Sequence, residues 1–228
     1  MIDKRKFYIN GTWINPIIKN DFEVINPSNE QPYAFISLGS KKDVDLAVNV
    51  AKKAFITWSQ VDKKEKIILL ENLLKIYKSR WDEITQTMSE EMGAPLDWSS
   101  SAQTSSGADH INDFILRLKN FEFEKRFNKN SNNYIVYEPI GVCGLITPWN
   151  WPINQITLKV IPALATGCTM ILKPSEIAPM SGIIFAEIIH EAGFPPGVFN
   201  LVNGDGDGVG TDLSSHHDID MISFTGST

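Results

Sequence analysis

Four short segments of this chain place polar or glycine residues directly after apolar runs, where they could do chemistry. They are residues 148–152, 173–176, 203–210 and 224–228. In the first, Asn150 stands between two tryptophans. An asparagine amide at a helix start can donate a hydrogen bond to the oxyanion that develops on a carbonyl substrate. Asparagine is also a common helix cap, and the spacing alone favours the cap.

The second segment combines a cation with a carboxylate three residues later, Lys173 and Glu176. A carboxylate can accept both hydroxyl groups of an adenosine ribose, while a nearby ammonium reaches a hydroxyl or a phosphate. The alternative is a solvated ion pair on a loop, which contributes little to stability.

The third segment, residues 203–210, is rich in glycine but contains no GxGxxG fingerprint. An EF-hand calcium loop starting at Asp205 would need Asp or Asn at its fifth position and Glu at its twelfth, where Val209 and His216 stand. A glycine-rich turn before a helix does let another group approach the backbone closely. In the fourth segment, Gly226 and Ser227 could present amides and a hydroxyl to a pyrophosphate.

Strands that alternate with helices must position these segments. The pattern predicts strands at 142–147, 169–172, 198–202 and 221–224, with helices at 153–165, 180–192 and 208–214 between them. Short connections of this kind indicate a parallel sheet with right-handed crossovers. Ligands bind such sheets beyond the carboxyl ends of the strands, where all four segments fall.

The first 130 residues read differently. An Asn-Gly turn predicts a hairpin over residues 7–13, and a strand follows near 33–37. Ser40 with Asp43 predicts the cap of a helix that extends to Trp58. One long helix is expected from Asp62 to Gly93, and a weakly patterned one over 96–118. A polar turn at 128–133 precedes a strand at 134–138.

Composition narrows the function classes. The net charge of −6 and the scattered basic residues argue against nucleic acid, and no run is long enough to span a membrane. The N-terminus lacks the apolar core of a signal peptide, so we expect a cytoplasmic protein. Cys143 and Cys168 are expected as small buried side chains rather than as a nucleophile. His216 and His217 are expected to point in different directions on the surface, and no metal site is predicted.

The segments that carry these residues read, in order, GVCGLITPWNWP, ILKPSE, FNLVNGDGDGVG and ISFTGST. They resemble the NAD(P)-dependent aldehyde dehydrogenases, and the resemblance covers essentially the whole chain. It implies an α/β fold with an incomplete, Rossmann-like parallel sheet. It further implies an N-terminal hairpin with helices (1–130), part of a bridging strand used in oligomerisation (131–140) and a truncated NAD-binding domain (141–228).

The resemblance also assigns roles to individual residues. Asn150 would polarise the substrate carbonyl, which reverses the preference for a cap. Residues expected to contact the cofactor are Ile146, Thr147, Pro148, Trp149 (mainly through its backbone), Lys173, Ser175, Glu176, Gly206, Gly210, Phe224, Thr225, Gly226 and Ser227. Residues expected to line the substrate tunnel are Trp151, Asn154, Gln155 and Leu158. Glu176 favours NAD, with NADP as the alternative, because a carboxylate would repel a 2′-phosphate.

In the family, the catalytic glutamate and cysteine follow the segment that ends at Thr228. We therefore expect an N-terminal portion that is inactive alone, within an enzyme that oxidises an aldehyde to an acid and forms a homodimer or homotetramer. Two alternatives stay open. One is a non-catalytic nucleotide-binding or interaction module, and the other is a split enzyme completed by a separate chain.

Overall fold

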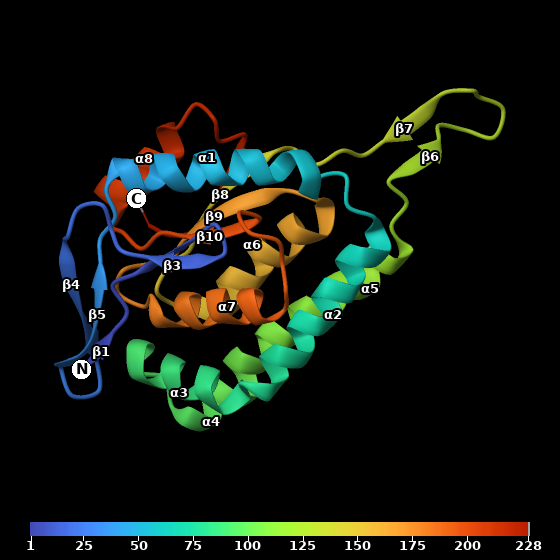
Figure 1. The fold of residues 1–228 in the computed structure, drawn as a ribbon. Helices are drawn as coiled ribbons and strands as arrows, with labels where there is room; N and C mark the ends of the chain where they lie inside the picture. Colours follow the sequence, from blue (N-terminus) through green and yellow to red (C-terminus); the bar gives the residue numbers. More distant parts are fainter. Residues whose placement is uncertain (228) are drawn as a thin grey trace.

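A mainly parallel sheet lies at the centre of the computed structural model, which describes residues 1–227 (Figure 1). Its strands, in spatial order, are β11 (Met221–Phe224), β8 (Val142–Ile146), β9 (Thr169–Lys173), β10 (Phe199–Leu201), β2 (Phe7–Ile9) and β3 (Thr12–Ile14). The first four run parallel, and β2 and β3 continue the sheet antiparallel. The predicted α/β class with a parallel sheet is confirmed.

Apolar side chains alternate along the strands and bury both faces of the sheet. On β8, Leu145 joins the core on one face and Ile146 joins the core on the other. The helices that cover these faces are α6 (Pro152–Thr166) with α7 (Met180–Glu191) on the first and α1 (Lys41–Trp58) on the second (Figure 1). Helices on both faces thus hold in place the strands whose ends carry the four segments of the sequence analysis.

A further helical layer packs outside α6 and α7. It consists of α2 (Lys63–Ser79), α3 (Trp81–Met92), α4 (Leu96–Trp98), a π-helical segment η1 (Ser99–Thr104) and α5 (Ser105–Asn120). Beside α1 lie a second π-helical segment, η2 (Gly206–Gly210), and α8 (Thr211–Ser215). Among residues 1–227, no helix combines the length and apolar character that a membrane crossing requires.

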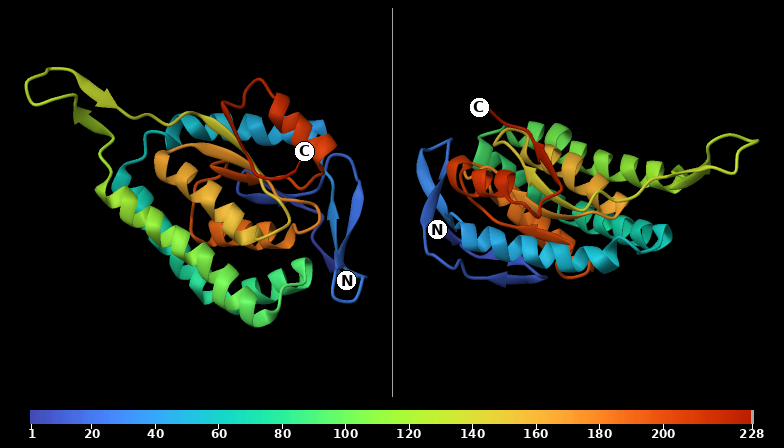
Figure 2. Two further views of the ribbon diagram at one scale, coloured as in Figure 1. Left: turned by 180° about the vertical axis from the view of Figure 1, so that it is seen from behind. Right: turned by 90° about the horizontal axis from the view of Figure 1, so that it is seen from above.

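Two small sheets lie at opposite ends of the molecule. At the N-terminal end, β1 (Ile2–Asp3) and β4 (Asp21–Asn26) pair with β5 (Gln31–Ser37); the sequence did not predict β4. At the other end, β6 (Glu124–Arg126) and β7 (Tyr134–Val136) form a ribbon that projects away from the body (Figure 2). The strand expected near Tyr134 is therefore present. Its role in oligomerisation and the division of the chain at 130 and 140 stay predictions.

The predicted hairpin and first helix cap are confirmed. Asn10 and Gly11 both have positive φ (55° and 74°), as a two-residue turn with the twist of a β-hairpin requires. At the start of α1, the Asp43 carboxylate accepts the backbone N–H of Ser40 at 2.8 Å.

The single long helix expected from Asp62 to Gly93 is wrong. It is divided into α2 and α3 at Arg80, whose backbone (φ −103°, ψ 21°) leaves the helical region. Between Asp62 and Met92 the sequence offers neither glycine nor proline as a break signal. The cause therefore lies in tertiary contacts rather than in local propensity.

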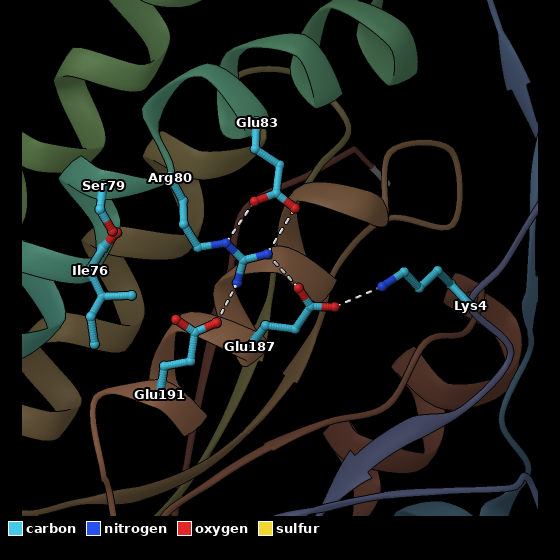
Figure 3. A network of polar contacts seen from close by, with 7 residues as sticks. All are labelled: Lys4, Ile76, Ser79, Arg80, Glu83, Glu187 and Glu191. Carbon is cyan, nitrogen blue, oxygen red and sulfur yellow. Dashed lines mark hydrogen bonds and ion pairs between the residues drawn. The ribbon is translucent and has the colours of Figure 1, made fainter.

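Those contacts centre on the Arg80 guanidinium (Figure 3). It donates to both carboxylate oxygens of Glu83 (2.7 and 2.8 Å), to Glu187 (2.6 Å) and to Glu191 (3.0 Å). Lys4 donates to the other oxygen of Glu187 at 2.7 Å. A planar cation with five donors can satisfy three carboxylates at once. The network thus joins the bend between α2 and α3 to α7 and to the N-terminal strand region.

A buried carboxylate joins α3 to the start of α7. Glu91 accepts the backbone N–H groups of Met180 (2.6 Å) and Ser181 (3.1 Å), and also the Ser181 hydroxyl. Two otherwise unpaired N–H groups at a helix start are thereby satisfied. Burial raises the pKa of Glu91 to about 7, although the donors from Ser181 and Met180 oppose the shift.

This pKa predicts a pH-dependent stability. The folded-state pKa of Glu91 is raised from 4.5, so the folded chain binds more protons than the unfolded chain between these values. The contribution of Glu91 to the free energy of unfolding is complete below pH 4.5 and is lost as the pH rises through about 7. Urea titrations at a series of pH values should show a free energy of unfolding that falls across this window. The fall should be smaller in Glu91→Gln, whose amide oxygen can still cap α7.

The matched control is Glu90→Gln, because Glu90 pairs with Gln86 on the surface of the same helix. In this variant, the free energy of unfolding should fall with pH as steeply as in the wild type. Equal slopes in wild type and Glu91→Gln would contradict the prediction.

Candidate functional site

The loops that follow β8, β9, β10 and β11 meet at one edge of the sheet, because these strands are parallel. Ile146 at the end of β8 lies opposite Lys173 at the end of β9. Backbone hydrogen bonds extend past the strand ends: Thr147 donates to the Lys173 carbonyl and Thr225 to the Ile146 carbonyl, both at 3.1 Å. The structure therefore brings the four segments of the sequence analysis together at one edge.

The loop after β8 passes from the core to the surface. Ile146 and Thr147 are buried, Pro148 is half-buried, and Trp149 and Asn150 are exposed. This path places the Asn150 amide outside the sheet, beyond the strand end.

Lys173 holds a buried ammonium between the loops after β9 and β10. Its Nζ donates to the carbonyls of Pro174 (3.1 Å) and Gly204 (2.5 Å) and lies 3.5 Å from the Glu176 carboxylate. Burial lowers the pKa of Lys173, and Glu176 opposes that shift. The Lys173 side chain is 4% exposed, so the alternative of a solvated ion pair is wrong for this residue. The Glu176 carboxylate keeps partial access to solvent.

The remaining predicted residue of this loop, Ser175, is buried. Its hydroxyl accepts the backbone N–H of Ile177 at 3.3 Å, and its carbonyl accepts that of Ala178 at 3.2 Å. These bonds shape the loop that presents Glu176.

The glycine-rich loop after β10 is closed by Asp205. Its side chain accepts the Gly208 N–H at 2.7 Å, and its carbonyl accepts the Gly210 N–H at 3.0 Å. A β-carbon added at Gly206 would meet no atom of the described chain within 4 Å. One added at Gly210 would lie 3.9 Å from the Lys173 side chain, and one at Gly204 would lie 2.2 Å from Val209. The loop therefore has open space at Gly206 and close packing at Gly204.

Two buried polar side chains at this edge have no hydrogen-bond partner within residues 1–227. They are the Thr147 hydroxyl, after β8, and the Asn203 amide, after β10. A buried polar group without a partner costs free energy, so each is a candidate to bind something outside the described chain. Thr147 is among the residues predicted from the sequence to contact the cofactor, whereas Asn203 is not. The available signal was its place directly beyond an apolar strand.

The segment after β11 is more open. The Phe224 side chain is 53% exposed, and a β-carbon at Gly226 would lie 2.8 Å from its ring. Thr225 is half-buried, and Gly226 and Ser227 are exposed. Thr228 lies outside the described residues.

Asn150 does not cap α6. The helix begins at Pro152, and the capping position is Trp151, whose φ of 53° is left-handed. Bulky side chains rarely adopt this conformation, which costs on the order of 1–3 kcal/mol. The Trp151 N–H donates to the Met92 sulfur at 3.4 Å, and its ring packs edge-on against Trp98 at 5.8 Å. These contacts hold Trp151 in place and turn the chain at Asn150.

Of the four residues predicted to line a substrate tunnel, Asn154, Gln155 and Leu158 share one face of α6, and Trp151 directly precedes the helix. Trp151, Asn154 and Gln155 are half-buried, and Leu158 is 41% exposed. On the opposite face, Ile153 and others pack into the core. The Asn154 carboxamide oxygen lies 2.6 Å from Nε2 of His110 on α5.

Two expectations about histidines and cysteines have different outcomes. The prediction that His216 and His217 point in different directions is wrong, because their rings stack at 5.1 Å with an interplanar angle of 8°. His216 is also largely buried, beside Asp45. Cys143 and Cys168 are buried, as expected. Their mutual hydrogen bond, together with burial, raises the pKa of Cys143.

Comparison with known proteins identifies the family. The sequence profile of the aldehyde dehydrogenase family matches residues 13–228. The chain belongs to the aldehyde dehydrogenase family.

Individual members of the family are similar over the whole chain. A 3-succinoylsemialdehyde-pyridine dehydrogenase from a Pseudomonas species is 50% identical over 100% of this chain and 47% of its own length. The crystal structure of an aldehyde dehydrogenase from Bartonella henselae superimposes with a TM-score of 0.98 at 54% identity, covering 100% of this chain and 48% of that one. The chain thus spans about half the length of these relatives.

A third similar aldehyde dehydrogenase has been solved with bound ligands. A mutant of aldehyde dehydrogenase C from Pseudomonas syringae, solved in complex with NAD+ and octanal, has a TM-score of 0.93 and 43% identity. The alignment covers 96% of this chain and 44% of that one.

Within this aldehyde dehydrogenase chain, the packing of the glycine-rich loop predicts opposite outcomes for two alanine substitutions. Gly204→Ala would place a methyl group 2.2 Å from Val209, so we expect it to lower the free energy of unfolding by about 1–3 kcal/mol. Gly206→Ala meets open space and should change it by less than about 0.5 kcal/mol. Chemical denaturation of both variants checks this. Similar losses in the two would show that the loop packs differently.

Proposed function

We propose that this chain forms the NAD-binding part, and one half of the oxyanion hole, of an enzyme that oxidises an aldehyde to a carboxylic acid. The observation that carries the proposal is the shared edge of the sheet, where Asn150, Glu176, Gly206 and Ser227 each follow a different parallel strand. Family membership supports an aldehyde as the substrate.

The residues at this edge fit a dinucleotide. The partly open Glu176 carboxylate, with Lys173 beside it, would hold the adenosine ribose, and the space at Gly206 would admit the adenine. Gly226 and Ser227 would face the pyrophosphate, and the buried Thr147 and Asn203 groups offer further partners. Contacts from Ile146, Pro148, Trp149, Ser175, Gly210, Phe224 and Thr225 complete the proposed site. NAD, when bound, accepts the hydride that leaves the substrate.

We favour NAD over NADP for an electrostatic reason. The Glu176 carboxylate would repel a 2′-phosphate. Lys173 compensates poorly, because two of its three protons are already donated to the carbonyls of Pro174 and Gly204. The NAD+ bound by the Pseudomonas syringae relative supports this choice.

Asn150 would hold the carbonyl oxygen of the aldehyde. Its amide is exposed beyond β8, on the side where Trp151, Asn154, Gln155 and Leu158 would line the approach of the substrate. A donor placed where negative charge develops lowers the barrier to attack on the carbonyl.

The nucleophile must come from elsewhere. Thiohemiacetal formation needs an accessible thiolate, and Cys143 and Cys168 are buried. We therefore propose that residues outside 1–228 supply the cysteine and the base that activates water, and that this chain alone does not turn over.

We also propose a substrate class, an assembly and a location. The relative named for 3-succinoylsemialdehyde-pyridine suggests an aldehyde that carries a ring. The projecting β6–β7 ribbon suits a homodimer or homotetramer, and we expect no nucleic-acid or membrane partner. Cys143 and Cys168 are both free thiols, which suits the reducing cytoplasm.

One observation favours a second candidate function. The groups that suit a nucleotide lie on this chain, whereas both of its cysteines are buried. A nucleotide-binding module without catalysis would have the same features. It predicts nucleotide binding but no aldehyde oxidation, even for the product of the reading frame expressed to its natural stop codon.

The proposed role of Asn150 predicts a defect in kcat. In the product of that complete reading frame, Asn150→Ala should lower kcat for aldehyde oxidation by about 10²–10³, with NAD affinity unchanged. The measurement is formation of reduced nicotinamide by absorbance. Asn112→Ala, on the exposed side of α5, is the matched control and should behave as wild type. A normal kcat in Asn150→Ala would remove this residue from the oxyanion hole.

The proposed role of Glu176 predicts a change in cofactor preference. Glu176→Gln removes the charge, so NAD should bind about 10–100-fold more weakly, as expected for loss of a hydrogen bond to a charged group. The affinity for NADP should rise relative to the affinity for NAD. Calorimetric titration with each nucleotide checks both effects, with Glu122→Gln at the exposed base of the β6–β7 ribbon as the control. An unaltered ratio of the NAD and NADP affinities in Glu176→Gln would place the ribose away from Glu176.

A further inference from the structure

A polar contact crosses from α5 to the proposed substrate face of α6. Nε2 of His110 lies 2.6 Å from Oδ1 of Asn154. Because a carboxamide oxygen can only accept, Nε2 carries the proton and donates it. The Asn154 amide is thereby fixed with Oδ1 toward α5, and its Nδ2 makes no hydrogen bond within residues 1–227. The side chain is half-buried, so these two N–H donors are available at the surface of α6.

An aromatic contact lies on the same face, three residues earlier on the chain. The ring of Trp98, which is 52% exposed, packs edge-on against Trp151 with centroids 5.8 Å apart. Between Trp98 and His110 runs the π-helical segment η1, a form that occurs frequently at functional sites. The α4–η1–α5 region thus contributes one aromatic and one polar residue beside the α6 face.

We propose that His110 is a positioning residue for substrate specificity: it orients the Asn154 amide to donate to a second oxygen on the aldehyde substrate. The inference rests on the proposed aldehyde oxidation and adds the substrate class, aldehydes that carry a hydrogen-bond acceptor as well as the reacting carbonyl. The edge-on Trp98–Trp151 pair adds exposed aromatic surface beside the same face, against which a substrate ring could pack.

The physical basis is the cost of an unpaired donor. An alkyl substituent on this face would remove water from the Asn154 amide without replacing its hydrogen bond, whereas a keto oxygen would replace it. Sites built to hydrogen-bond a substrate group discriminate against analogues that lack the group. One such hydrogen bond corresponds to about a tenfold preference in kcat/KM.

A pair of aldehydes of equal size tests the inference. Para-acetylbenzaldehyde and para-isopropylbenzaldehyde share the ring and the reacting group, and differ by a keto oxygen in place of a methyl group. The complete reading frame, expressed to its natural stop codon, should oxidise the acetyl compound about tenfold more efficiently. Asn154→Leu and His110→Leu should each abolish this preference, mainly by raising KM for the acetyl compound.

Two further variants separate positioning from general damage. His110→Gln keeps a donor for Asn154 and should restore most of the preference, and Asn112→Leu on the exposed side of α5 should leave it intact. A preference that survives in both leucine variants overturns the inference and leaves the proposed function standing. Absence of oxidation of both aldehydes by the wild-type protein, despite NAD binding, overturns both.

Discussion

The buried ammonium of Lys173 is the interaction on which the arrangement of the site depends. A cation removed from water is costly unless oxygens surround it, and Nζ finds the carbonyls of Pro174 and Gly204 and the carboxylate of Glu176. The parallel pairing of β9 and β10 brings those oxygens together. The Lys173 side chain thus joins the loops after β9 and β10 and also orients the Glu176 carboxylate, which is proposed to bind ribose. The same ammonium therefore determines both the shape of the loops and the position of the binding group.

The helical layers add rigidity around that centre through two charged contacts. Arg80 gathers three carboxylates between the α2–α3 bend and α7, and Glu91 caps the first turn of α7 from the end of α3. Both fix α7, which covers the same sheet face as α6. Because Met92, next to Glu91, also accepts the Trp151 N–H, the position of α3 is coupled to the strained turn that exposes Asn150. The outer helices therefore contribute to the site although they lie outside the sheet.

The sequence predicted those features that depend on local pattern. Apolar runs followed by glycine or polar residues located β8 to β11 and their loops, and the Asn10-Gly11 turn located the hairpin. What it missed depends on residues far apart in the chain. The bend at Arg80 is stabilised by glutamates more than 100 positions later, and the partner of His110 lies 44 positions away. The unpaired state of Asn203 is a property of its surroundings, so no local pattern could reveal it.

The surface around the strand-end loops is as informative as the polar groups. Three large apolar side chains here are at least half exposed: Trp149 (56%), Ile177 (50%) and Phe224 (53%). Each follows or ends a strand of the parallel sheet. Exposed apolar side chains on the same loops as the polar groups are typical of a binding surface. A dinucleotide offers hydroxyls and phosphates for Glu176 and Ser227, and flat bases for the apolar rim. A purely polar ligand would leave that rim in water, and a purely apolar one would strip water from Glu176 without replacing it, so the composition of the edge itself favours a nucleotide.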